Sequence, residues 1–126
     1  MLPRFSYWAV IVALYAIQDS GIPDEACFPY QAVDHIPCSY ACNNVESRKV
    51  YLEDFYTPLP DELKLALLGG PVATNFQVYD NFGYYEEGVY SAYGANPGPV
   101  GHAVVIVGWE DELQAWLVKN SFGPGW

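Results

Sequence analysis

The sequence is poor in basic residues: only five Lys and Arg stand against fifteen Asp and Glu, which gives a formal net charge of −10. Proteins that bind nucleic acid or anionic membranes rely on basic patches, because those contacts release counterions. Without such a patch, neither nucleic acid nor a membrane is an expected partner. The acidic residues are spread along the chain, which favours a solvated surface over an acidic binding tail.

Internal repeats, low-complexity tracts and phosphate-binding glycine loops are also absent. Hydrophobic residues make up 52% of the chain and aromatic residues 17%, and this composition argues against disorder. A length of 126 residues is typical of one domain. Such a chain could bury roughly two-thirds of its unfolded surface.

A long apolar run is missing as well. The run over residues 5–17 is too short to span a bilayer. Arg4 in front of it gives the outline of a signal peptide, but no small-x-small cleavage site follows. Gly21 instead stands where a helix would end, and the preceding apolar residues recur at helical spacing, which favours a buried helix over about residues 5–20. The spaced residues are Tyr7, Val10, Leu14 and Ile17.

Two segments near the end of the sequence, 101–109 and 115–119, are rich in β-branched and aromatic residues. They predict a β-hairpin whose turn is the polar run 110–112. If the hairpin is symmetric about Asp111, the facing pairs are Ile106 with Trp116, Val104 with Val118, and His102 with Asn120. Because side chains alternate with period two, all six lie on one face, with His102 and Asn120 at the open end.

The pairing of His102 with Asn120 has a chemical consequence. A neutral imidazole has one N–H and one bare nitrogen, and an Asn carbonyl that accepts the N–H fixes the tautomer and the ring plane. This is the base and orienter part of a catalytic triad, whose nucleophile would come from another segment. The alternative is a strand-end histidine with a purely structural partner.

The hairpin resembles the histidine and asparagine motifs of the papain-like cysteine peptidases, roughly G-H-A-V-x-x-V-G-[YW] and [YW]-[WIL]-[VI]-K-N-S-W-G. Three upstream segments, 21–30, 63–72 and 80–90, resemble other motifs of the family in the same order. The resemblance covers about residues 14–126. It implies an α+β, papain-like fold fragment. Residues 1–45 would be a remnant of the helical lobe, with a Cys-containing loop over 22–45, and residues 46–126 most of the antiparallel β-barrel lobe, truncated at its C-terminus.

By this resemblance, His102 is the general base, and Asn120 orients it. Phe122 stands where the family has a tryptophan that shields the bond between them from water. Asn75 and Ala103 fall where the family lines a substrate side-chain pocket. Gly101 belongs to the loop that borders the substrate cleft.

The nucleophile of the family is missing. Its motif, Q-G-x-C-G-[SA]-C-[WY], matches none of the three cysteines, Cys27, Cys38 and Cys42, and no matching glutamine precedes them. Loss of the nucleophile lowers activity roughly a millionfold in comparable enzymes, so this chain alone is expected to be inactive. We interpret it as an incomplete cysteine-type endopeptidase that needs the N-terminal half of the same fold and acts on a peptide or protein substrate. The alternative function is a non-catalytic homologue that serves as a binding or regulatory module.

The three cysteines and His35 also suggest a zinc site, but they lack the paired C-x-x-C spacing of structural zinc. The family resemblance favours disulfides, with one thiol left free or paired outside this chain. No metal or other cofactor is expected.

The same resemblance, with the acidic composition, indicates an extracellular or lysosome/vacuole-like compartment. Two scaffolding elements complete the interpretation: a short amphipathic helix over 61–68 and a rigid turn over 96–101 that leads into His102.

Overall fold

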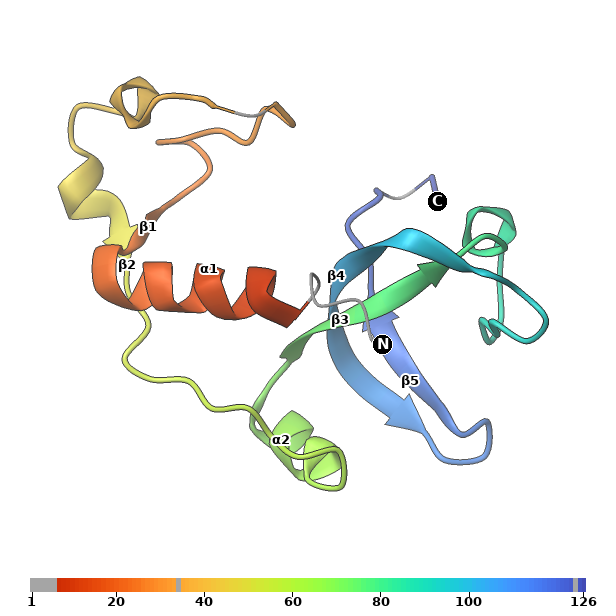
Figure 1. Cartoon of the computed structure of the whole chain (residues 1–126). Helices are drawn as coiled ribbons and strands as arrows, with labels where there is room; N and C mark the ends of the chain where they lie inside the picture. Colours follow the sequence, from red (N-terminus) through yellow and green to blue (C-terminus); the bar gives the residue numbers. More distant parts are fainter. Residues whose placement is uncertain (1–6, 34, 124) are drawn as a thin grey trace. The chain divides into compact units, whose positions relative to one another are not determined.

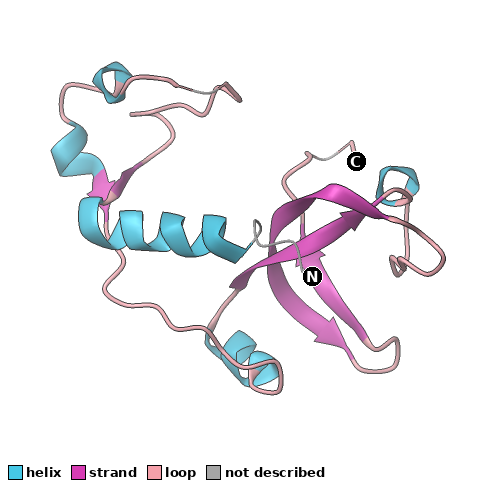
Figure 2. Ribbon diagram, viewed as in Figure 1, coloured by secondary structure: helices cyan, strands magenta, loops and turns pink. Residues whose placement is uncertain are grey.

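The computed structural model describes residues 7–33, 35–123 and 125–126. Their backbone contacts divide into two compact units, Val12–Tyr56 and a second that contains Thr57–Trp126 and the first residues of helix α1. Figures 1 and 2 show the elements, a mixture of helices and antiparallel sheets that confirms the predicted α+β class. The helices are α1 (Tyr7–Ser20) and α2 (Leu63–Gly69), and the strands are β1 (Ile22–Pro23), β2 (Lys49–Val50), β3 (Val72–Tyr79), β4 (Pro97–Glu110) and β5 (Ala115–Lys119). The predicted lobe boundary after residue 45 stays a prediction.

Helix α1 ends where the sequence predicts. Gly21 adopts a left-handed φ of 71°, and its N–H donates to the Ile17 carbonyl at 3.0 Å, as in a glycine-terminated helix. A side chain there would also lie 2.8 Å from the Tyr51 ring. From Val10 onwards, however, no α1 side chain is buried, and Val12 is 59% exposed. The helix itself is present as predicted, and its burial stays a prediction. Neither described helix is long and apolar enough to cross a membrane.

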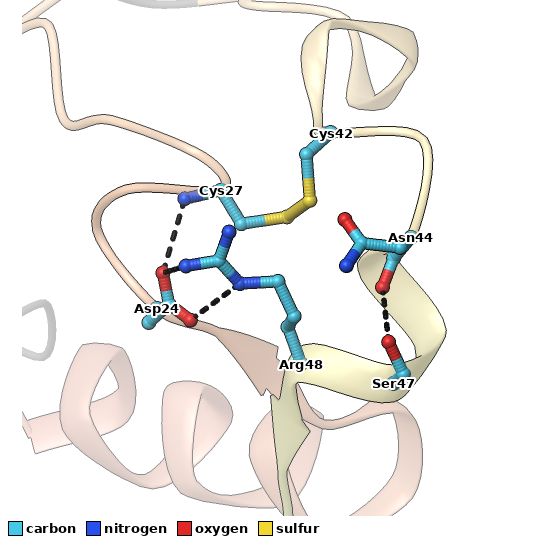
Figure 3. Close-up of a disulfide and its surroundings, with 6 residues drawn as sticks. All are labelled: Asp24, Cys27, Cys42, Asn44, Ser47 and Arg48. Carbon is cyan, nitrogen blue, oxygen red and sulfur yellow. Dashed lines mark hydrogen bonds and ion pairs between the residues drawn. A yellow bond between two sulfur atoms is a disulfide. The ribbon is translucent and has the colours of Figure 1, made fainter.

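A disulfide between Cys27 and Cys42 closes the loop that follows β1 (Figure 3). Arg48 donates two hydrogen bonds to the Asp24 carboxylate, at 2.8 and 2.5 Å, and the Cys27 N–H donates to the same group at 3.1 Å. The Arg48 hydrogen bond is the main cause that lowers the pKa of Asp24. Cys38 remains a free, exposed thiol. The predicted disulfide is therefore present, and it uses two of the cysteines that a zinc site would need.

The second unit is built on a three-stranded antiparallel sheet in the order β3-β4-β5. Figure 1 shows β4 as the long, curved central strand. Val104 and Ile106 on β4 are 7% and 6% exposed, and with Phe82 they form the buried core of this unit. These positions alternate with more exposed neighbours, as expected for a sheet with one apolar face.

The hairpin of β4 and β5 forms, but its register differs from the prediction. Ile106 pairs with Val118 instead of Trp116, a shift of two residues. The turn is longer than predicted, because it continues to Gln114, which has a φ of 49°. A bulge adds Val107 to β4 between the pairs Ile106 with Val118 and Gly108 with Leu117. A shift of two residues preserves which side chains share a face, and Val104, Ile106, Trp116, Val118 and Asn120 all line one groove of about 760 Å³.

The prediction of a rigid turn over 96–101 is also wrong. β4 already begins at Pro97, and Pro97 pairs with Tyr79. Between this pair and the pair of Gly101 with Gln77, β4 contains three residues and β3 contains one, Val78. Proline is tolerated in a strand at such a bulge, where ladder hydrogen bonds are interrupted.

Helix α2 begins two residues later than the predicted helix over 61–68 and ends at Gly69. Lys64 on this helix hydrogen-bonds Asp111 in the turn of the hairpin, and the Trp109 indole also donates to Asp111, at 3.3 Å. The ammonium of Lys64 lies 5.6 Å from the centre of the Trp109 ring. The hydrogen bond from Lys64 is the main cause that lowers the pKa of Asp111. These contacts attach α2 to the hairpin.

Candidate active site

His102 lies on the central strand β4, opposite Phe76 of β3. Its imidazole Nε2 is 2.8 Å from Oδ1 of Asn120, the first residue after β5. The structure thus brings together the two side chains that the sequence predicts as a pair. They meet diagonally, because the shifted register places Asn120 nearer Val104 along the strands. Both side chains are half-buried.

The same Asn120 oxygen accepts a hydrogen bond from the Ser121 backbone N–H, at 2.7 Å. A backbone N–H can only donate, so the atom that it faces is the carbonyl oxygen of the Asn120 amide and not its nitrogen. Nε2 of His102 therefore carries a proton and donates it to that oxygen. In the neutral ring, Nδ1 is then the bare nitrogen, with a lone pair available to a proton donor.

Aromatic rings surround the imidazole. The Phe122 ring stacks on it, with centroids 4.6 Å apart and planes inclined by 32°, and the Phe76 ring meets it edge to face at 5.7 Å. Phe82 contacts Phe76 at 5.1 Å and Tyr90 at 5.0 Å, also edge to face. Phe122 is itself 53% exposed. Its role in shielding the bond between His102 and Asn120 from water stays a prediction.

Asn75 and Ala103 are direct cross-strand partners on β3 and β4. Because side chains alternate along each strand, this pair lies on the face of the sheet opposite to Phe76 and His102. Gly101 pairs with Gln77 at the edge of the bulge. The three predicted substrate-binding residues are thus adjacent to His102 in the chain or in the ladder, and their role in binding stays a prediction.

The amide nitrogen of Asn120 is the one buried side-chain nitrogen or oxygen without a hydrogen-bond partner in the part of the chain that the structure describes. A buried donor without an acceptor costs about 1–3 kcal/mol. Tyr90, nearby in the same aromatic cluster, does have a partner, since its hydroxyl donates to Asn81 at 2.6 Å. Burial of the ring raises the pKa of Tyr90.

Within the described residues, no group of three or more His, Cys, Asp and Glu side chains is arranged to hold a metal ion. Cys27 and Cys42 are joined in a disulfide, and Cys38 belongs to the unit Val12–Tyr56.

The sequence interpretation missed Phe76 and Phe82 as neighbours of His102. Phe76 could have been found from the period-two pattern of β3, but the contacts of Phe82 depend on the path of the loop after that strand.

A histidine whose tautomer is fixed by an asparagine has the geometry of the base and orienter pairs that are used in nucleophilic hydrolysis. The family model described as papain family cysteine protease matches residues 8–126. This chain belongs to that family, and the predicted family resemblance is confirmed. No solved structure matches the chain significantly.

Several curated relatives are similar over most of this chain. Pro-cathepsin H of Medicago truncatula is 35% identical over 117 residues, which cover 89% of this chain and 33% of the relative. Thiol protease aleurain of Arabidopsis thaliana is 36% identical, with coverage of 89% and 32%. Cathepsin B-like CP3 of Giardia intestinalis is 34% identical over 119 residues, with coverage of 85% and 39%. The chain spans about a third of the length of these relatives.

Proposed function

We propose that this chain supplies the base and the orienting amide of a papain-family cysteine endopeptidase, and that a segment with the family's cysteine motif supplies the nucleophile. The observation that carries the proposal is the assignment of Asn120 Oδ1 by the Ser121 N–H, because it leaves Nδ1 of His102 as a proton acceptor. Asn120 keeps that nitrogen aimed, and Phe122 shields the bond between the two side chains.

In the proposed reaction, Nδ1 of His102 takes the proton of the thiol, and the thiolate attacks the carbonyl carbon of the peptide bond. The imidazolium then donates this proton to the leaving amine, and a thioester remains. Water hydrolyses the thioester, with His102 acting as base again. Asn75 and Ala103 line the subsite for the substrate side chain, and Gly101 borders the substrate cleft. The polar amide of Asn75 suits that subsite to side chains that can hydrogen-bond.

The remainder of the papain-like fold is the proposed partner of this chain. In support, several large apolar side chains of the second unit are exposed, and two of them, Phe122 and Trp126, lie 5.3 Å apart. Exposed apolar patches commonly mark an interaction surface. The exposed side chains include Trp116, Leu117, Phe122 and Trp126, which are 43%, 62%, 53% and 43% exposed. The Cys27–Cys42 disulfide supports an extracellular or lysosome/vacuole-like compartment, where such bonds persist.

The test is peptidase activity of a polypeptide that contains this chain together with a papain-family cysteine segment, assayed with a peptide substrate and a thiol reductant. We expect His102→Ala to lower kcat/KM by about a hundred- to ten-thousand-fold, the usual contribution of a general base. His35→Ala is the matched control, because His35 is exposed and outside the site. Equal activity of the His102→Ala and parent proteins would contradict the proposal. An inactive parent protein with correct folding would instead favour the non-catalytic binding module.

A further inference from the structure

Gln77 makes an unusual set of contacts on β3. Its side-chain Nε2 lies within hydrogen-bond distance of three backbone carbonyl oxygens: 3.0 Å from that of Val78, 2.8 Å from that of Gly98 and 3.0 Å from that of Val100. An amide NH₂ group has only two protons, so three carbonyls share them. Gln77 thus ties its own strand to two points on β4.

The bulge of β4 explains why these carbonyls converge on one side chain. Gly98, Pro99 and Val100 stand opposite the single residue Val78, so the regular ladder cannot pair them. Pro99 also has no N–H to offer. The two backbones approach closely here, since a side chain on Gly98 would lie 3.0 Å from the Val78 oxygen. The Gln77 amide supplies the donors that the interrupted ladder lacks.

The bulge lies directly before His102 on β4. Val100, one of the three partners of Gln77, is two residues before His102, and Gly101 is the cross-strand partner of Gln77 itself. Bulges near active sites re-aim the side chains that follow them. A displacement of β4 at this point would move the His102 ring relative to Asn120, which is held by β5 instead.

We propose that Gln77 is a positioning residue for His102: by clamping the bulge of β4, it holds the imidazole within hydrogen-bond distance of Asn120 and so maintains the tautomer with a bare Nδ1. The proposal rests on the proposed function for its catalytic meaning. Its structural content, the dependence of the His102 tautomer on Gln77, stands on the geometry alone.

The test compares Gln77→Met, Gln77→Glu and the parent chain by long-range ¹H–¹⁵N NMR of the His102 ring. Met keeps the length of the side chain without donors, and Glu at neutral pH opposes the three carbonyls with a negative charge. We expect the Nδ1 and Nε2 resonances to move toward one another, as the single tautomer becomes a mixture, with the larger effect in Gln77→Glu. The matched control is Gln18→Met, which removes an amide that donates to one backbone carbonyl, that of Glu53, at 3.2 Å. This control should leave the His102 resonances unchanged.

Unchanged His102 resonances in a folded Gln77→Met chain would overturn the proposal. If that variant lost its dispersed NMR spectrum, Gln77→Asn replaces it, since the shorter amide keeps its donors but cannot reach all three carbonyls. Unchanged His102 resonances in that variant would likewise overturn the proposal. In the complete peptidase we expect Gln77→Met to lower kcat more than it changes KM. The His102 tautomer can be measured in a chain that has no nucleophile. Failure of the Gln77 proposal is therefore distinguishable from failure of the proposed function, which is tested by the peptidase activity of His102→Ala.

Discussion

Phe82 offers the sharpest test of how the site is supported. It is the buried centre of the aromatic cluster, 8% exposed, with Phe76 at 5.1 Å and 71° and Tyr90 at 5.0 Å and 80°. Edge-to-face pairs of this kind contribute about 0.5–1.5 kcal/mol each beyond the area that they bury. Phe82→Leu keeps most of the apolar volume but removes both pairs. We therefore expect it to lower the free energy of unfolding by about 1–3 kcal/mol.

The assay is urea unfolding followed by tryptophan fluorescence and by circular dichroism, because coincident transitions are needed to treat the change as a single free energy. The control is Tyr84→Leu, which removes an aromatic ring two residues away that is 85% exposed. That change should stay within about 0.5 kcal/mol of the parent chain. If Phe82→Leu unfolded at the same urea concentration as the parent, the aromatic cluster would not support the second unit, and our reasoning would be refuted.

Three further predictions concern charges and the disulfide. The pKa of Asp24 is lowered in the folded chain, so the stability that its bonds to Arg48 contribute is present above about pH 4 and is lost as the pH falls through the lowered value. The loss of stability between pH 7 and pH 3, measured by urea unfolding, should therefore be smaller in Asp24→Asn than in the parent chain. Equal losses would contradict this. Cys27→Ser opens a loop with a sequence separation of 15 and should lower the stability of the unit Val12–Tyr56 by about 3 kcal/mol, as measured by hydrogen exchange. Unchanged protection of its amides would show that the disulfide does not stabilise this unit. Lys64→Ala removes a solvent-exposed ion pair and should lower the free energy of unfolding, measured in urea, by at most about 1 kcal/mol. A larger loss would mean that Lys64 contributes more to the attachment of α2 to the hairpin than an exposed ion pair can.

The sequence was sufficient to predict the hairpin and the pairing of His102 with Asn120. Both depend on local signals: β-branched residues in two adjacent segments, a polar turn between them, and alternation that survives a shift of two residues. The register could not be predicted, because the turn extends to Gln114 and Val107 adds a bulge. Neither feature changes the pattern of apolar residues from which the prediction was made.

The segment before His102 shows a different limit. Prolines and glycines over 96–101 are typical of a turn, yet they also suit a bulged strand, and the two cannot be distinguished from composition. The clamp by Gln77 exists only because of that bulge. Similarly, the apolar spacing of α1 predicts the helix correctly but says nothing of which surface covers it, and Val12 is left exposed.

The protonation of the His102 ring tests the central claim most directly. In mildly alkaline solution, long-range ¹H–¹⁵N NMR of the chain should show Nε2 protonated and Nδ1 bare, because Asn120 Oδ1 accepts from Nε2 and from the Ser121 N–H. A protonated Nδ1, or an even mixture of the two tautomers, would contradict the account, since His102 would then have no fixed nitrogen with which to accept the proton of a thiol.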